Sequence, residues 1–179
     1  MPRIIIIGPA HPLRGGLATF DERLAREFQN LSWDVEIYTF SLQYPNLLFP
    51  GKTQYSNTPK PVDLKIQVCI NAINPLNWFR IGQEIKNKNA DIVLTRYWIP
   101  FMAPCLGTML RIIRGNNKSK LVCLVDNIIP HEKRIGDKLL TRFFVNVPEW
   151  FICMSESVET ELKTFRPKSP KYIDRSSFI

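Results

Sequence analysis

A run of four isoleucines near the amino terminus most constrains the fold of this chain. Residues 4–7 follow Arg3 and end at Gly8, with no polar residue among them. A strand of this composition is buried on both faces, as strands are in a parallel sheet. A loop rich in proline and glycine follows at 9–16, and residues 34–40 alternate in polarity as a second strand does.

The segment between these two strands has the periodicity of an amphipathic helix. Phe20, Leu24 and Phe28 recur every four residues within 17–30 and form one apolar stripe. Charged residues fill the rest of this helix: Asp21, Glu22, Arg23, Arg26 and Glu27. Strand, glycine loop, helix and strand in this order are the opening unit of a doubly wound α/β fold.

The rest of the chain continues the alternation of strands and helices. Residues 41–63 are rich in proline and have no period, which predicts a long loop. The predicted fold class is α/β, a single Rossmann-like domain over 1–165 with a mostly parallel sheet flanked by helices, followed by an irregular tail over 166–179. Apolar runs predict the later strands at 64–70, 90–95, 120–125 and 150–154, and amphipathic stretches predict helices at 77–87, 102–114, 137–146 and 156–165.

The composition excludes several classes of protein. The chain has 179 residues, 45% of them hydrophobic, which can support a core and excludes general disorder. Lys and Arg number 24 against 16 Asp and Glu, for a formal charge of +8. Much of this excess lies near the carboxyl terminus, in a segment without periodicity. A nucleic-acid interface needs a basic stripe on a folded face, so we expect no nucleic-acid partner.

Cysteines and histidines give no metal site in this sequence. The four cysteines lie too far apart for a CxxC pair and each is in an apolar run, which predicts buried free thiols in a reducing compartment: Cys69, Cys105, Cys123 and Cys153. Two histidines and scattered cysteines do not form a zinc site, so we expect neither a metal nor a cofactor. The longest uncharged stretch, 97–110, contains prolines and is shorter than the ~20 residues of a membrane-spanning helix.

One segment has the pattern of a membrane-surface helix. A basic amphipathic helix can lie on an anionic bilayer. The alternative is an ordinary packed helix with a solvated basic face. We expect a cytoplasmic protein because its cysteines suit a reducing compartment. The two interpretations of this segment leave peripheral contact with the inner face of the membrane open. The segment, 131–144, combines the bases Lys133, Arg134, Lys138 and Arg142 with Leu139, Leu140, Phe143 and Phe144.

The first loop that could carry chemistry ends in two glycines. Gly15 and Gly16 precede the first predicted helix, and exposed N–H groups at a helix N-terminus favour an anion such as phosphate. The alternative is that both glycines only make a tight turn. The loop matches neither GxGxxG nor the P-loop pattern, which argues against a dinucleotide or Walker-type site. His11, in the same loop, is expected to be solvated.

Three other loops follow predicted strands. Arg96 comes directly after a strand and suits binding of a phosphate or carboxylate, with a surface salt bridge as the alternative. Residues 126–134 are polar and contain Asn127 and His131, and the alternative for this histidine is packing or capping. Ser155 is expected to cap the last helix.

Taken together, these loops resemble the N-terminal, acceptor-side domain of family 4 glycosyltransferases, which have the GT-B fold. The resemblance covers about residues 1–165, and no single motif carries it alone. Its four motifs occur in the family's order: IIIIGPAHPLRGGLATFDERLA, ADIVLTRYWIP, LVDNIIPHE and FICMSESVETEL.

The resemblance implies an enzyme of the hexosyltransferase type. Such an enzyme moves a sugar from a nucleotide-sugar to a glycan or lipid-linked acceptor, with retention and without a metal, in surface polysaccharide or glycolipid synthesis. His131 would be the catalytic residue, forming a hydrogen bond to the donor sugar as charge develops at the anomeric carbon. Gly15 and Gly16 would approach the donor phosphate or the acceptor, and Arg96 and Asn127 would bind substrate at the same rim.

The chain departs from the family pattern in one large respect. The C-terminal donor-binding domain, with its Glu-x7-Glu pattern, is absent, and no glutamate here has another eight positions later. We therefore expect a truncated part of an enzyme that is inactive alone. One alternative is a non-catalytic Rossmann-like binding module that pairs with a separate donor-domain chain. Another is a nucleotide-binding protein of a different kind.

Overall fold

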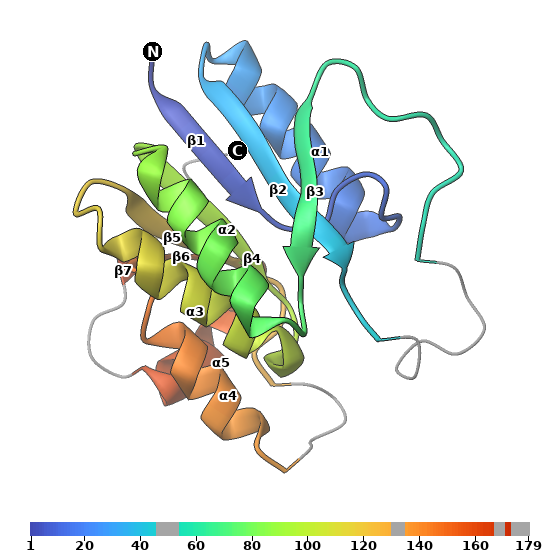
Figure 1. Cartoon of the computed structure of the whole chain (residues 1–179). Coiled ribbons are helices and arrows are strands. Elements are labelled where there is room, and N and C mark those ends of the chain that lie inside the picture. The colour runs from blue at the N-terminus through green and yellow to red at the C-terminus, as the bar shows by residue number, and fades with distance from the viewer. Residues whose placement is uncertain (46–53, 130–134, 167–170, 173–179) are drawn as a thin grey trace.

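The chain folds around a seven-stranded parallel sheet (Figure 1). The computed structural model describes residues 1–45, 54–129, 135–166 and 171–172. The strand order is β3-β2-β1-β4-β5-β6-β7, and every ladder in it is parallel. The strands are β1 (Arg3–Ile7), β2 (Asp34–Leu42), β3 (Lys65–Asn71), β4 (Ile92–Tyr97), β5 (Lys120–Val125), β6 (Trp150–Cys153) and β7 (Lys171–Tyr172).

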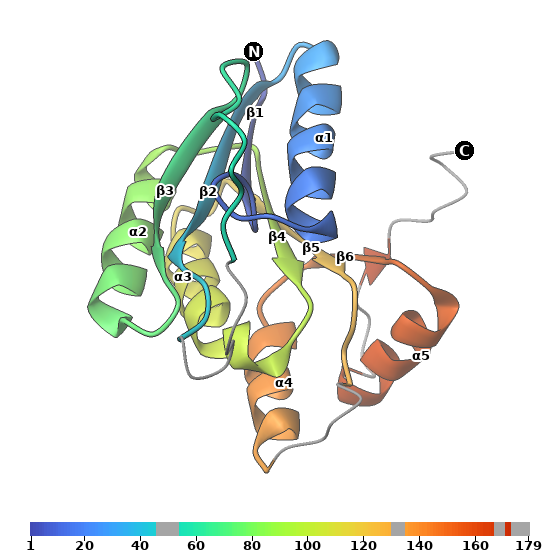
Figure 2. The same ribbon diagram turned by 90° about the vertical axis from the view of Figure 1, so that its right-hand side faces the viewer.

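Helices cover both faces of this sheet. Figure 2 shows α1 alone on one side of the strands, and α2 and α3 on the other. Further along the sheet, α4 packs against α3 and α5 packs beside α4 and β6. The helices are α1 (Gly16–Asn30), α2 (Pro75–Asn87), α3 (Ala103–Arg114), α4 (Asp137–Val145) and α5 (Glu156–Phe165), and a short 3-10 turn, η2 (Pro100–Met102), precedes α3.

Strand alternation divides the core into two clusters, one on each face of the sheet. Ile4 and Ile6 belong to the cluster under α1, whereas Ile5 and Ile7 belong to the larger cluster under α2, α3 and α4. All four isoleucines are fully buried. This is why the first strand carries no polar residue, as the sequence pattern predicted.

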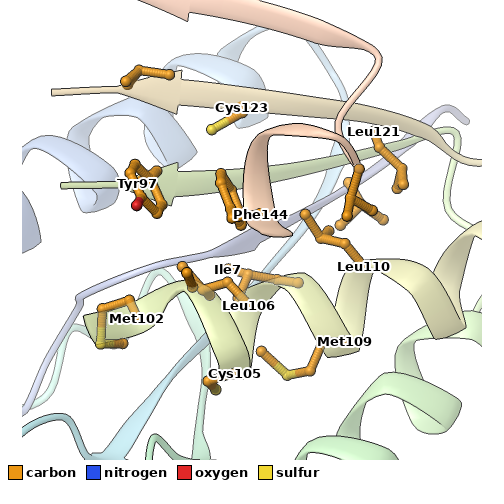
Figure 3. Packing of buried hydrophobic residues seen from close by; sticks show 14 of the residues in the cluster. Ile7, Tyr97, Met102, Cys105, Leu106, Met109, Leu110, Leu121, Cys123 and Phe144 are labelled. Carbon is orange, nitrogen blue, oxygen red and sulfur yellow. The ribbon is translucent and has the colours of Figure 1, made fainter. Parts of the chain in front are cut away.

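The larger cluster is closed by contacts between strands and helices (Figure 3). Tyr97 of β4 stacks on Phe144 of α4 with ring centroids 4.4 Å apart, and its hydroxyl lies 3.1 Å from that of Thr141. Gly82 of α2 lies close to α3, where an added Cβ would come within 3.3 Å of the Cα of Met109. These contacts fix α3 and α4 on the sheet.

The exposed edge of the sheet at β3 is covered by a side-chain amide. The Nδ2 of Asn77, in the first turn of α2, donates to the carbonyl of Cys69 at 2.9 Å. The Oδ1 of Asn77 accepts from the N–H of Asn71 at 2.8 Å, and Trp78 Nε1 donates to the carbonyl of Asn71. Asn77 thus occupies the place of a further strand at the carboxyl end of β3, which protects that part of the edge from pairing with another chain.

The predicted elements are confirmed, with one added strand that the sequence did not reveal. Each strand and helix expected within 1–165 is present, and most boundaries shift by two residues or fewer. The tail expected to be irregular contains β7, which extends the sheet beside β6. A two-residue strand leaves too little pattern to recognise. Cys105, Cys123 and Cys153 are buried free thiols as expected, whereas Cys69 is only half-buried.

Replacing Asn77 by Ala tests the edge cover. We expect a loss of about 1–2 kcal/mol in the free energy of unfolding, because two backbone groups lose their partner. Alanine has the higher helix propensity, so propensity alone predicts the opposite sign. Urea unfolding measures the change, and light scattering reports pairing at the freed edge. The control is Gln83→Ala on the exposed side of the same helix, which should be nearly neutral.

Candidate functional site

The carboxyl ends of β1, β4 and β5 meet where the order of the strands reverses. From β1 the chain runs outward through β2 to β3, and β4 then returns to the other side of β1. In open α/β sheets ligands bind outside the carboxyl ends of the strands at such a switch point. The loops after β1, β4 and β5 therefore define the candidate site.

Arg96, the next-to-last residue of β4, forms the floor of this site. Its Nε and Nη2 donate to the two carboxylate oxygens of Asp126 at 2.7 and 2.6 Å, and its Nη1 donates to Oδ1 of Asp21 at 2.6 Å. The guanidinium also lies over the ring of Phe20, 4.6 Å from its centroid. With only 2% of its surface exposed, Arg96 is committed to two carboxylates.

Asp21 completes the network from helix α1. It is fully buried, and its second oxygen, Oδ2, has no hydrogen-bond partner among the described residues. That oxygen is packed against Gly8, where an added Cβ would lie 2.3 Å from it. Burial raises the pKa of Asp21 from 3.8 to about 7, although Arg96 acts in the opposite direction. Burial prevails because the same guanidinium is already shared with Asp126.

Strand alternation explains why these groups meet. Gly8, Arg96 and Asp126 each stand two positions after a residue of the α1-side cluster: Ile6, Leu94 and Leu124. All three therefore face α1 at the ends of neighbouring strands. Glycine at position 8 leaves the space that the carboxylate of Asp21 fills.

Two expectations about these residues need correction. Asp21 was grouped with the charged, outer side of its helix, but it is buried on the inner side between Ala18 and Ala25. The available signal was that Asp21 lies on the same side of the helix as the small residues Ala18 and Ala25. Arg96 was expected at the rim or in a surface salt bridge, but its ion pairs lie in the interior. In this structure Arg96 binds Asp126, and the function proposed below gives Arg96 that positioning role in place of direct contact with substrate.

Gly15 and Gly16 lie at the amino end of α1 and play different structural roles. Gly15 has φ 115° and ψ 173°, a region populated essentially by glycine. Gly16 is the first residue of the helix and has no such requirement, since a Cβ there would meet nothing within 4 Å. Both glycines are exposed, and no side chain caps this helix terminus. A tight turn therefore accounts for Gly15 but not for Gly16.

The long loop after β2 packs against the glycine loop. Tyr55 forms an isolated antiparallel bridge with Leu13, and the N–H of Arg14 donates to the carbonyl of Gln54 at 3.0 Å. His11 is tied down as well: its Nε2 lies 3.0 Å from the carbonyl of Thr58, and its N–H donates to Glu22. No motif or period in the sequence indicated these contacts, and His11 was expected to be solvated.

The other predicted site residues fall on the same edge or outside the described residues. Asn127 is the second residue after β5, is half-buried and makes no hydrogen bond to any described residue. His131 lies in 130–134, outside the described part of the chain. Ser155 caps α5 as expected, accepting from the N–H of Val158 at 3.3 Å. The structure brings Arg96 and Asp126 together, and Asn127 is the residue after Asp126 in the chain.

The described residues contain neither a group of metal ligands nor a membrane-spanning helix. Within 1–45, 54–129 and 135–166, no three His, Cys, Asp or Glu side chains gather as metal ligands would. None of the helices in these ranges is long and apolar enough to span a bilayer.

Comparison with known proteins supports the fold and leaves the family open. Neither a family model nor a curated protein matches the sequence. Among solved structures, an alpha-glucosyltransferase in complex with UDP and a 13-mer DNA matches with TM-score 0.63 and 13% identity, covering 97% of this chain and 43% of that one. UDP-GlcNAc 2-epimerase from Methanocaldococcus jannaschii matches with TM-score 0.59 and 11% identity, over 97% and 45%.

A third match agrees with these two. The putative UDP-N-acetylglucosamine 2-epimerase from Listeria monocytogenes has TM-score 0.52 and 11% identity, over 94% of this chain and 43% of that one. At such identities the likeness establishes the fold alone. The predicted fold class, a Rossmann-like α/β domain of the kind found in GT-B enzymes, is confirmed. The chain spans less than half the length of these three proteins.

The titration of Asp21 can be tested by pH-dependent unfolding. Between its ordinary pKa of 3.8 and about 7, the folded chain keeps a proton that the unfolded chain releases. The contribution of Asp21 to stability is therefore greatest below the lower value and is lost as the pH rises to the upper one. The free energy of unfolding should therefore fall as the pH rises from ~5 to ~7.5. In Asp21→Asn we expect this fall to be smaller by on the order of 1–3 kcal/mol.

Urea midpoints at the two pH values give the result. Asp63→Asn is the control: Asp63 is exposed, and Arg26 lowers its pKa, so it does not titrate in this window. An unchanged pH dependence in Asp21→Asn would contradict the assignment.

The two glycines can be separated by alanine substitution. Gly15→Ala should cost about 1–3 kcal/mol of unfolding free energy, because alanine is strained at that backbone conformation. Gly16→Ala should be neutral or stabilising by up to ~1 kcal/mol, since it adds helix propensity in open space. Urea unfolding distinguishes them, and a large loss in Gly16→Ala would mean that Gly16 serves the turn.

Proposed function

We propose that this chain is the acceptor-side domain of a retaining glycosyltransferase of family 4, of the hexosyltransferase type. The observation that carries the proposal is the open amino end of α1 beside the switch point. There Gly16 is exposed, uncapped and unexplained by packing or backbone conformation. Backbone N–H groups at such a terminus can bind a phosphate or a sugar hydroxyl closely.

The fold neighbours support a sugar-modifying enzyme. An alpha-glucosyltransferase and two UDP-GlcNAc 2-epimerases share this architecture over nearly all of the chain. Since the chain spans less than half of their length, we propose that it supplies the acceptor side and that a donor-binding domain supplies the rest. On this proposal the chain alone does not catalyse transfer.

The proposed roles of the residues follow from their places in the site. Gly15 and Gly16 approach the donor phosphate or the acceptor, and Asn127 binds the acceptor with an amide that no described residue uses. Arg96, buried as it is, acts by holding Asp126 and so the start of the loop that contains Asn127. The role of His131 as the residue that meets the donor sugar rests on the family resemblance alone.

The acceptor we propose is a glycan or a lipid-linked saccharide. One fold neighbour is bound to DNA, but the described rim of this chain presents Gly15, Gly16 and Asn127 rather than a basic stripe. The nucleotide-sugar is a substrate, and the proposal includes no metal or cofactor. Free cysteines suit a reducing compartment, so we propose the cytoplasm.

The alternative function is a non-catalytic module that pairs with a separate donor-domain chain. The short span against the fold neighbours is compatible with it. Both proposals predict that the chain alone is inactive. Restoration of transfer by a separate donor-domain protein in a 1:1 complex would favour the module.

Saccharide binding by the purified chain tests the acceptor-side assignment. An array of oligosaccharides, free and lipid-linked, is the probe, with UDP and UDP-glucose titrated in parallel. We expect saturable binding of at least one saccharide, little binding of the nucleotides, and no transfer. Asn127→Ala should weaken saccharide binding by about tenfold, the loss of roughly one to two hydrogen bonds.

Asn87→Ala is the matched control. Asn87 is an exposed asparagine at the end of α2, on the opposite edge of the sheet, so its loss should leave saccharide binding unchanged. Tight nucleotide binding without saccharide binding would point to a nucleotide-binding protein of another kind. Turnover by the chain alone would contradict the predicted inactivity.

A further inference from the structure

Helix α4 carries an apolar stripe that the described part of the chain leaves uncovered. Ile135, just before the helix, is fully exposed, Leu139 is 72% exposed and Phe143 is 38% exposed. Leu139 and Phe143 are one turn apart and lie along one side of α4, and Ile135 precedes the helix by two positions. Thr141, Phe144 and Val145 face inward and hold the helix on the core. Most exposed apolar residues on a protein need no explanation, but a contiguous stripe does.

Basic side chains lie on both sides of this stripe. On one flank, Lys138 and Arg142 are exposed and form no ion pair with the described residues. On the other flank, Arg111 of α3 lies over the ring of Phe143, 3.7 Å from its centroid, and donates to the carbonyl of Phe143 at 2.5 Å. The one acid of the helix, Asp137, is half-buried on the inner side.

The position of Phe143 is fixed by packing as well. Its ring lies against Gly107 of α3, where an added Cβ would come within 2.7 Å of Cε1. The exposed edge of the stripe is therefore part of a rigid surface formed by α3 and α4. Figure 2 shows that α4 begins beyond the carboxyl ends of the strands, on the same edge of the sheet as the candidate site.

We propose that this α4 face binds the surface of an anionic lipid bilayer. Apolar side chains with a basic rim match the interface of such a bilayer, where Leu and Phe enter the acyl boundary and Lys and Arg meet the headgroups. The stripe contains only three apolar residues. Their combined surface is much smaller than the ~800 Å² that each partner buries in a specific protein interface. A lipid surface needs no such matched area, because each basic residue meets a headgroup of its own.

Lipid binding by this face does not depend on the transferase proposal. If that proposal also holds, the face brings the carboxyl edge of the sheet to the membrane surface, where a lipid-linked acceptor resides. Failure of vesicle binding would leave the saccharide test untouched, and failure of the saccharide test would leave vesicle binding untouched.

Co-sedimentation with vesicles tests the proposal on the whole chain. Vesicles of phosphatidylcholine alone are compared with vesicles that contain phosphatidylcholine and about one-third phosphatidylglycerol. We expect binding to the anionic vesicles only, weakening at least tenfold when the salt is raised from ~0.05 to ~0.5 M, because the charges are screened. No binding to anionic vesicles at low salt would overturn the proposal.

Two pairs of variants separate the α4 face from general charge and general hydrophobicity. Leu139→Glu should weaken binding at least tenfold, whereas Leu76→Glu, at an equally exposed leucine of α2, should not. The double change Lys138→Glu with Arg142→Glu should abolish binding, whereas Arg23→Glu with Arg80→Glu, which alters the net charge equally, should retain most of it.

Unfolding midpoints show whether each variant is folded, since all six positions are exposed. Equal losses in both members of a pair would overturn the proposal. So would a stable dimer of the wild-type chain that Leu139→Glu dissociates without changing vesicle binding, because a second copy would then be the partner of the face.

Discussion

The pairing of Arg96 with two carboxylates is the interaction on which the arrangement of the site depends. A guanidinium buried under a helix must have partners, because an isolated charge there is very costly. Asp126 binds two of its nitrogens and Asp21 a third, which joins the ends of β4 and β5 to α1. Such networks add little net stability, since desolvation offsets the attraction, but removal of one member leaves an unpaired buried charge. Their main effect here is to fix geometry.

This geometry gives the carboxyl edge a rigid floor and an open rim. The floor is polar but already satisfied, apart from the single Asp21 oxygen against Gly8. The rim consists of groups with no structural partner among the described residues: the amino end of α1 at Gly16 and the amide of Asn127. A preorganised floor and an unfilled rim are what a binding site requires. The α4 face lies beside the same edge and offers a different surface for a different ligand.

Much of the fold could be predicted from sequence because the central strands β1 and β5 are apolar runs and β2 alternates in polarity. Residues 4–7 of β1 and 121–125 of β5 are buried on both faces, so period and burial agree. Asp21 was misplaced because a helical pattern marks a charged residue as solvent-facing unless its partner is known, and Arg96 lies 75 positions away. The packing of residues 54–58 on the glycine loop and the edge cover by Asn77 were missed for the same reason. Both consist of contacts between segments with no shared periodicity.

The most direct test is to measure NMR chemical shifts of the backbone amides and the arginine Nε–H groups in the isotope-labelled chain. The spectra are recorded with and without a saccharide that the chain binds. We expect the shifted amides to cluster at Gly15, Gly16 and Asn127, while the Nε–H signal of Arg96 stays in place because Asp126 continues to hold it. Shifts centred on the amino ends of the strands, or displacement of the Arg96 signal by the ligand, would contradict a rigid floor beneath an open rim.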